Sequence, residues 1–189
     1  MWEFNLNSGY MNDKAGFIAA WQRIVTRIRQ GAGDRVKFSW CPAASTNSLS
    51  TLQECYPGDG YVDVVAIDTY DAWVSSGQGF HDEATWLSQT GVGDLFGWAK
   101  AKGKLFAFDE WGGHNVNVGA NHSGGDNPDF YRLVLEFCRK NADWIAYECV
   151  YSESEAGNVE NNLFATNGTP VQLPNSRAAY IAKVQSLVL

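Results

Sequence analysis

The sequence predicts an α/β fold in which strands alternate with amphipathic helices along a mostly parallel sheet. Residues 61–71, YVDVVAIDTYD, form a nearly continuous apolar run rich in Val and Ile, which is typical of a strand buried on both faces. Residues 15–30 repeat apolar side chains at i, i+3, i+4 and i+7, the spacing of a helix with one buried face. Strand-like and helix-like segments then alternate through four or five units. This order favours either an open doubly wound sheet or part of a (β/α)8 barrel.

The expected elements follow one another with short connections. Strands are predicted over 35–42, 61–71, 104–112 and 144–153, and residues 1–5, MWEFN, indicate the end of a further strand. Helices are predicted over 15–30, 48–55, 127–141 and 175–188, with another inside 82–103 that starts near residue 93. Pro128 suits the start of its helix, and Asn175 or Ser176 is a plausible cap for the last one.

Composition and charge restrict the classes of partner. The 189 residues are 45% hydrophobic, enough for one globular domain with a core. The net charge of −7, with no local cluster of Lys and Arg, would repel phosphate backbones, so nucleic acid is not an expected partner. No apolar run approaches the roughly 18 residues of a membrane span, and no signal peptide is visible, so no membrane partner is expected.

The cysteine and histidine content argues against a metal site. The four cysteines form no C-x-x-C pair and there are only three histidines, so a zinc site is not expected. A disulfide between Cys41 and Cys55 and free, partly buried thiols at Cys138 and Cys149 are both compatible with these positions.

Carboxylates occur at the ends of two predicted strands. FAFDEWG, residues 106–112, ends in Asp109, Glu110 and Trp111, and MWEFN contains Glu3. In a barrel all carboxyl ends of the strands lie on one face, where such enzymes place their chemistry. Two carboxyl groups in one cleft are what glycosidic bond cleavage requires: one protonates the leaving oxygen and the other attacks the sugar carbon or activates water. A separation of about 5–5.5 Å gives retention, and about 6.5–9.5 Å gives inversion.

Polar and aromatic residues around these acids suit a sugar site. Tyr70 is expected to hydrogen-bond Glu110 and keep it ionised. The substrate-binding candidates are Asn5, Trp40, Tyr70, Asp71, Trp73, Trp111, His114 and Tyr147. Structural roles compete with these assignments: Trp40 fits a core equally well, Asp68 fits a buried structural acid, and His114 fits an ordinary loop. Asp109 has the opposite parity to Glu110 and is interpreted as structural.

Four motifs in order carry a resemblance to a known family. WEFN, FSWCP, YPGDGYVDVVAIDTYD and FDEWG, in this spacing, resemble glycoside hydrolase family 26, whose members are (β/α)8-barrel enzymes, most of them β-mannanases, in a clan of retaining glycosidases. The resemblance covers nearly the whole chain. It implies a single partial (β/α)-barrel domain over residues 1–189, an incomplete barrel of about five βα units corresponding to strands four to eight. By the same resemblance Glu3 is the acid/base, Glu110 the nucleophile, and Tyr70 the tyrosine that hydrogen-bonds the nucleophile.

The resemblance also has departures. Ala43 stands where the family commonly has Asn, Tyr147 and Glu148 stand where other residues are frequent, and strands one to three have no counterpart. The expected function is a retaining endo-β-glycanase that hydrolyses β-1,4-linked polysaccharide, with a mannan-like substrate favoured and no cofactor. An extracellular location follows from the family's usual substrates, and the N-terminal half of the same barrel is an expected partner. The alternatives are an inactive truncated domain that serves as a carbohydrate-binding or structural remnant, and an unrelated sheet protein whose acids merely end strands.

Overall fold

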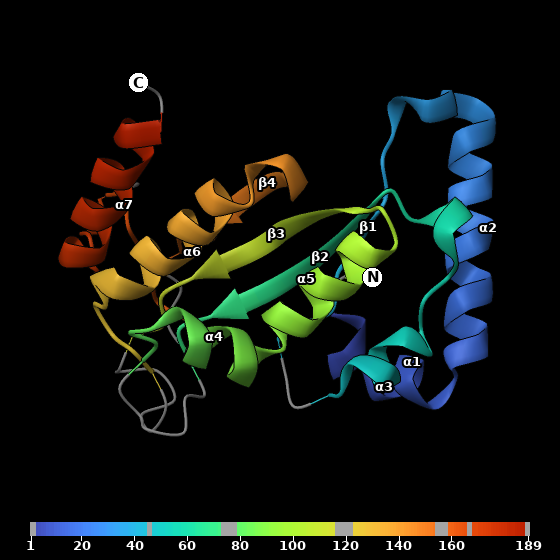
Figure 1. Ribbon diagram of the computed structural model, residues 1–189, viewed down its shortest axis with the longest axis horizontal. Coiled ribbons are helices and arrows are strands. Elements are labelled where there is room, and N and C mark those ends of the chain that lie inside the picture. The colour runs from blue at the N-terminus through green and yellow to red at the C-terminus, as the bar shows by residue number, and fades with distance from the viewer. Residues whose placement is uncertain are drawn as a thin grey trace. The chain divides into compact units, whose positions relative to one another are not determined.

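The computed structural model describes residues 3–44, 47–72, 79–115, 123–153, 159–165 and 168–187 (Figure 1). Within these ranges one sheet has the strand order β1-β2-β3-β4, formed by β1 (Ser39–Trp40), β2 (Val64–Tyr70), β3 (Leu105–Gly112) and β4 (Ile145–Val150). β1 and β2 are parallel, with Ser39 opposite Val64. β2 and β3 are neighbours, and their arrows point the same way in Figure 1. The predicted α/β class with a parallel sheet is therefore confirmed.

Helices precede β1, connect the successive strands and follow β4. They are α1 (Ser8–Asn12), α2 (Lys14–Ala32), α3 (Leu49–Gln53), α4 (Glu83–Thr90), α5 (Val92–Ala101), α6 (Pro128–Lys140) and α7 (Pro174–Leu187). Short 3-10 turns lie at η1 (Phe4–Leu6), η2 (Gly33–Arg35), η3 (Asp59–Tyr61) and η4 (Ala142–Trp144). None of the helices in the described ranges is long and apolar enough to cross a membrane.

Three predicted elements differ from the structure. The strand expected over 35–42 shortens to Ser39–Trp40, and its first residue, Arg35, belongs to η2. The segment 82–103 holds two helices instead of one, since Gly91 adopts a left-handed conformation (φ 75°) between α4 and α5. In the strand end expected over MWEFN, residues 1–2 lie outside the described residues, and Phe4 and Asn5 belong to the 3-10 turn η1 and not to a strand.

The cap of the last helix also differs from the prediction. α7 begins at Pro174, and neither Asn175 nor Ser176 acts as its cap. Instead the carboxylate of Asp126 accepts hydrogen bonds from the backbone N–H groups of Asn175 and Ser176, at 2.9 and 2.7 Å. A carboxylate at a helix N-terminus accepts hydrogen bonds from free N–H groups and complements the helix dipole. Asp126, which is distant in the sequence, therefore caps α7 in place of a neighbouring residue.

The chain divides into two compact units. The first consists of Met1–Asp68, Thr90–Asp109 and Trp144–Tyr147. Its core includes a chain of aromatic contacts in which the Trp40 ring lies 5.0 Å from that of Phe4 and 5.7 Å from that of Trp98. Small buried side chains at Cys41, Val64, Ala66 and Ala107 form a second cluster.

The second unit consists of Thr69–Gln89, Glu110–Asp143 and Glu148–Leu189. Its core is built on α6, which starts with Asn127 as N-cap and Pro128 in the first turn. Phe130 of α6 packs near the rings of Trp86 and Trp111, with centroids 6.2 and 6.0 Å away. α6 and α7 lie side by side in this unit (Figure 1).

Candidate active site

Glu110 and Tyr70 meet at the carboxyl ends of two neighbouring strands. Tyr70 is the last residue of β2, and Glu110 lies two residues before the end of β3. The Tyr70 hydroxyl donates a hydrogen bond to Oε1 of Glu110 at 2.5 Å, and both side chains are half-buried. The expected contact between Tyr70 and Glu110 is confirmed. This hydrogen bond holds Oε1 of Glu110 against the Tyr70 hydroxyl and so orients the carboxylate.

The backbone that carries Glu110 is held on both sides. The Trp111 carbonyl accepts a hydrogen bond from the N–H of Tyr151 at 2.7 Å, and the Gly112 carbonyl accepts one from the N–H of Asp71 at 3.0 Å. Because these bonds come from the segments that follow β4 and β2, the end of β3 cannot twist without breaking them. The strand end therefore presents Glu110 in a fixed position.

Tyr151 is a candidate site residue that the sequence interpretation missed. Its half-buried ring packs edge-on against Tyr70, with centroids 6.0 Å apart and planes at 79°. It follows directly after Val150, the last residue of β4, so its position at a strand end was the feature that could have identified it. Tyr147, which was expected to bind substrate, lies inside β4, and its hydroxyl donates to Oδ1 of Asp109 at 2.7 Å.

Glu3 is placed by its backbone next to the end of β1. Its N–H donates to the Cys41 carbonyl at 2.8 Å, and its own carbonyl accepts from Leu6 at 2.9 Å. Its φ of 51° and ψ of 30° are left-handed, which is uncommon for a residue with a Cβ. Such strain is concentrated at functional sites, so this backbone supports a functional role for Glu3 as a hypothesis. Its side chain is half-buried.

Cys41 is a buried thiol of the first unit. Burial raises the pKa of Cys41 well above its ordinary value, and the negative charges of Asp109, Asp68 and Glu3 act in the same direction. Asp109 also accepts a hydrogen bond from the Ser39 hydroxyl at 2.7 Å, in agreement with its interpretation as structural. Asp68 is buried.

All four cysteines are free thiols, so the structure has no disulfide between Cys41 and Cys55. Among the described residues, no group of three or more His, Cys, Asp or Glu side chains is arranged to hold a metal ion.

Asn5 and Trp40, two of the expected substrate-binding residues, are buried in the first unit. The Asn5 carboxamide pairs with the backbone of Ala43: its Oδ1 accepts the Ala43 N–H at 2.8 Å, and its Nδ2 donates to the Ala43 carbonyl at 3.0 Å. The Trp40 ring has no exposed surface. A sugar cannot stack on a fully covered ring, so Trp40 is a core residue in this structure, as the alternative interpretation of the sequence allowed.

Trp111 and His114 are likewise buried, in the second unit. The Trp111 ring is fully covered, and its indole N–H donates to Oε2 of Glu148 at 2.6 Å. His114 Nδ1 lies 2.8 Å from the Ser123 hydroxyl, and burial lowers the pKa of His114 below its ordinary value. Neither side chain presents a surface to a ligand here. Trp73, the remaining aromatic of the expected sugar floor, lies outside the described residues.

Asp71 is fully buried, contrary to the expectation that it binds sugar hydroxyls. Its Oδ1 accepts the backbone N–H of Phe80 at 2.7 Å, and its Oδ2 accepts Nδ2 of Asn127 at 2.8 Å. Burial raises the pKa of Asp71 from 3.8 to about 6, although these two hydrogen bonds and the charge of His81 favour the ionised form. The carboxyl group is engaged within the fold and not exposed to substrate.

The raised pKa of Asp71 predicts a pH-dependent stability. Because the folded state holds the proton more tightly than the unfolded state, the contribution of Asp71 is full below pH 4 and is lost as the pH rises through about 6. A shift of about two units corresponds to at most about 3 kcal/mol. Urea unfolding of the wild type and of Asp71→Asn at pH 4.5 and 7.5 measures this. We expect the difference in unfolding free energy between the wild type and the variant to shrink by about 1–3 kcal/mol at the higher pH. An unchanged difference would contradict the assignment.

The variant also serves as a control for His114. The lowered pKa of His114 makes the unfolding free energy fall with acidification, and this contribution is the same in both proteins and cancels in the difference.

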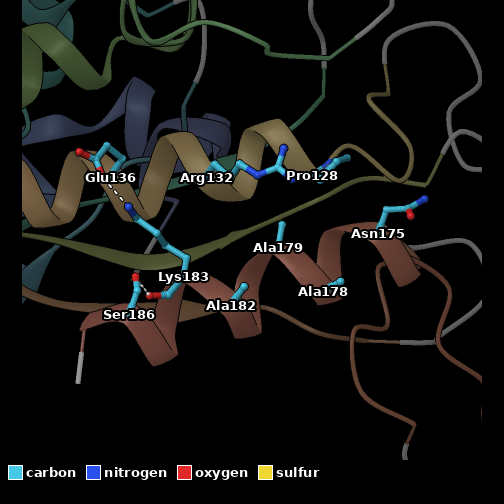
Figure 2. Close-up of a pocket in the computed structure, with 9 residues that line it drawn as sticks. All are labelled: Pro128, Arg132, Glu136, Asn175, Ala178, Ala179, Ala182, Lys183 and Ser186. Atoms are coloured by element: carbon cyan, nitrogen blue, oxygen red, sulfur yellow. Dashed lines mark hydrogen bonds and ion pairs between the residues drawn. The ribbon is translucent and has the colours of Figure 1, made fainter. Parts of the chain in front are cut away.

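A surface groove of about 670 Å³ lies between α6 and α7 and contains none of the predicted catalytic residues (Figure 2). Its α7 wall includes the small side chains of Ala178, Ala179 and Ala182. Lys183 of α7 donates to Glu136 of α6 across the groove (Figure 2). The packing of α6 against α7 within the second unit forms this groove.

Comparisons with known proteins agree with this fold. The model of glycosyl hydrolase family 26 matches residues 13–109, which is just over half of the chain. This match includes β1, β2 and most of β3. A search among curated proteins gave no match.

Solved structures of similar fold include three mannanases. The catalytic domain of a family 26 endo-β-1,4-mannanase from Bacillus sp. JAMB-750 has a TM-score of 0.63 and 23% identity over 91% of this chain and 44% of its own. A family 26 β-mannanase from Bacteroides ovatus has a TM-score of 0.61 and 16% identity over 92% and 44%. An endo-β-1,4-mannanase from Cellulomonas fimi has a TM-score of 0.56 and 24% identity over 87% and 34%.

These likenesses establish the fold. The neighbours are (β/α)8 barrels, and this chain spans between 34% and 44% of their length, so its sheet corresponds to an incomplete barrel. The family match, which rests on the sequence itself, goes further than the fold, and the chain belongs to glycosyl hydrolase family 26.

Proposed function

We propose that this chain carries the catalytic carboxylates of a retaining endo-β-glycanase that cleaves β-1,4-linked polysaccharide, with mannan as the favoured substrate. The observation that carries the proposal is the hydrogen bond from Tyr70 to Glu110 at the strand ends of a family 26 chain. The printed descriptions of the structural neighbours, endo-β-1,4-mannanases, support mannan over other glycans.

In the first step Glu110 is the nucleophile. Tyr70 holds Oε1, and Oε2 attacks the anomeric carbon of the sugar on the non-reducing side of the scissile bond. As the bond from this carbon to the glycosidic oxygen breaks, the Glu3 carboxylic acid transfers its proton to that oxygen. The products are a glycosyl ester on Glu110, a released sugar chain with a free hydroxyl at the former glycosidic oxygen, and the Glu3 carboxylate.

In the second step Glu3 changes its role. Its carboxylate takes a proton from water, and the water oxygen attacks the anomeric carbon and displaces the Glu110 carboxylate. Two inversions at one carbon give net retention, and both residues return to their starting protonation states. Each step needs only these two groups and water, so we propose no cofactor.

The remaining barrel strands are part of the proposal. The described sheet has four strands, and an eight-stranded barrel closes only when further strands cover its two edges. We propose that the N-terminal half of the same barrel supplies them and the rest of the sugar site. A polysaccharide substrate, too large to enter cells, would place the enzyme outside the cell.

The substrate assay compares mannan, glucomannan, xylan and mixed-linkage glucan. Reducing-sugar release is measured for this chain and for the chain extended at its N-terminus by the remaining strands, each with Glu110→Gln as the blank. We expect release above the blank, largest on mannan, and proton NMR of the first products should show the β-anomer. Release of the α-anomer would overturn retention.

The carbohydrate-binding alternative makes a different prediction for the same proteins. It requires oligosaccharide binding that Glu3→Gln leaves unchanged, with no turnover by either length of chain. Hydrolysis that disappears in Glu3→Gln would reject this alternative.

A further inference from the structure

The buried Asp71 carboxylate joins segments that are far apart in the chain. Its two oxygens accept the N–H of Phe80 and Nδ2 of Asn127, and the same Nδ2 also donates to the Phe80 carbonyl at 3.0 Å. Asn127 in turn accepts the N–H of Asp129 and caps α6. The side chain of Asp71 therefore connects the segment before α4 with the start of α6.

The backbone of Asp71 adds connections in two further directions. Its N–H donates to the carbonyl of Gly112, two residues after Glu110, and its carbonyl accepts the N–H of Gly124 at 2.8 Å. Ala72 and Ser123 then form an antiparallel bridge. Since Asp71 directly follows Tyr70, these bonds fix the peptide unit from which the Tyr70 side chain projects.

Two glycines lie against the Asp71 carboxylate, and neither position has room for a side chain. A Cβ at Gly124 would lie 1.7 Å from Oδ2 of Asp71, and a Cβ at Gly79 would lie 2.8 Å from the same oxygen. At Gly79 φ is 79°, a conformation that favours glycine. Any side chain at either position would displace the carboxylate, so the backbone packs directly around Asp71.

We propose that Asp71 is a positioning residue that sets the Tyr70 hydroxyl against the Glu110 carboxylate. This inference rests on the proposed function, because it assigns a purpose to the position of Glu110. Asp71 touches no substrate; it acts through Tyr70, whose backbone it holds from three segments. A loss of the Asp71 contacts would let the strand end shift, and displacements of about 1 Å at a nucleophile cost as much as about 100-fold in rate.

Three variants test the proposal. Asp71→Asn keeps the shape but turns an NH2 group toward one of two N–H donors, so one contact is lost. Asn127→Ser keeps a side chain that caps helices well but cannot reach Asp71, and serves if Asp71→Asn does not fold. Asp94→Asn makes the same chemical change at an exposed position of α5 and is the matched control.

The first readout needs no turnover. In protein labelled with 13C at tyrosine Cζ, the Tyr70 signal is assigned by its loss in Tyr70→Phe. Glu110→Gln should shift this signal in the wild-type and Asp94→Asn backgrounds, because Tyr70 donates to Glu110. In Asp71→Asn the change in chemical shift caused by Glu110→Gln should fall to about half or less of its wild-type size. In Asn127→Ser it should also fall, but by a smaller amount. A shift of undiminished size in a folded Asp71→Asn or Asn127→Ser protein would overturn the inference, whether or not the chain hydrolyses any glycan.

The second readout separates positioning from general stability. We expect Asp71→Asn to lower kcat by about 10- to 100-fold with little change in KM. In a Tyr70→Phe background the same substitution should lower kcat by only about twofold, because both act on one contact. Full additivity of the two losses would contradict action through Tyr70. An inactive wild type would count against the proposed function and leave the NMR readout to decide on Asp71.

Discussion

Replacing Glu110 with Gln is expected to abolish glycan hydrolysis, with residual activity at or below about one part in 10⁴ of the wild-type rate. The amide has the size of the carboxylate and can still accept the hydrogen bond from Tyr70, so the fold should be unaffected. It carries no charge and cannot form the glycosyl ester, so the covalent step is lost. Initial rates of reducing-sugar release, with circular dichroism to verify folding, measure the effect.

A surface glutamate supplies the control for this substitution. Glu54 is exposed and pairs with Lys14, and exposed ion pairs contribute little to stability, so Glu54→Gln should keep the full rate. Azide gives a second check: with Glu110→Ala it should restore turnover by attacking the anomeric carbon itself, forming a glycosyl azide of inverted configuration. A Glu110→Gln rate within about twofold of the wild type would remove Glu110 from the mechanism.

Trp111→Ala is expected to destabilise the protein by about 3–5 kcal/mol. The Trp111 ring is fully covered and lies 5.2 Å from the ring of Tyr131 and 6.2 Å from that of Tyr180. Its truncation leaves a cavity beside these rings and removes the donor to Glu148. Urea unfolding at neutral pH measures the loss of unfolding free energy.

This prediction decides between the two interpretations of Trp111. A tryptophan that floors a sugar site would weaken oligosaccharide binding when truncated and would change stability little. A packing residue would do the reverse, and Trp111→Phe, which keeps most of the volume, should cost less than Trp111→Ala. A stability loss below about 1 kcal/mol in Trp111→Ala would contradict the packing role.

The sequence predicts β2 and β3 well because these strands have a strong local pattern. The apolar run over 61–71 gives β2, and the run that ends in Glu110 gives β3, with only the outer residues misplaced. The contact between Tyr70 and Glu110 was also predictable, because side chains at the ends of neighbouring parallel strands must lie close together.

The errors share a physical cause, which is that the partners are distant in sequence. Asp71 looks like a ligand-binding acid at a strand end until Phe80 and Asn127, 9 and 56 residues away, are seen to occupy both its oxygens. Trp111 follows the nucleophile and suggests a sugar platform, but rings of α6 and α7 cover it. Composition and periodicity report that a residue is polar or aromatic, whereas tertiary packing decides whether it faces a ligand.

The most direct test of the central claim is trapping of the glycosyl-enzyme. A 2-deoxy-2-fluoro-β-mannosyl fluoride forms the ester readily and slows its hydrolysis, so the intermediate accumulates. For the chain that releases sugar in the substrate assay, intact-mass measurement should show the addition of one fluorosugar. Peptide mapping should place it on Glu110, and Glu110→Gln should remain unlabelled. Hydrolysis without any labelled carboxylate, or a label on a carboxylate other than Glu110, would contradict the account.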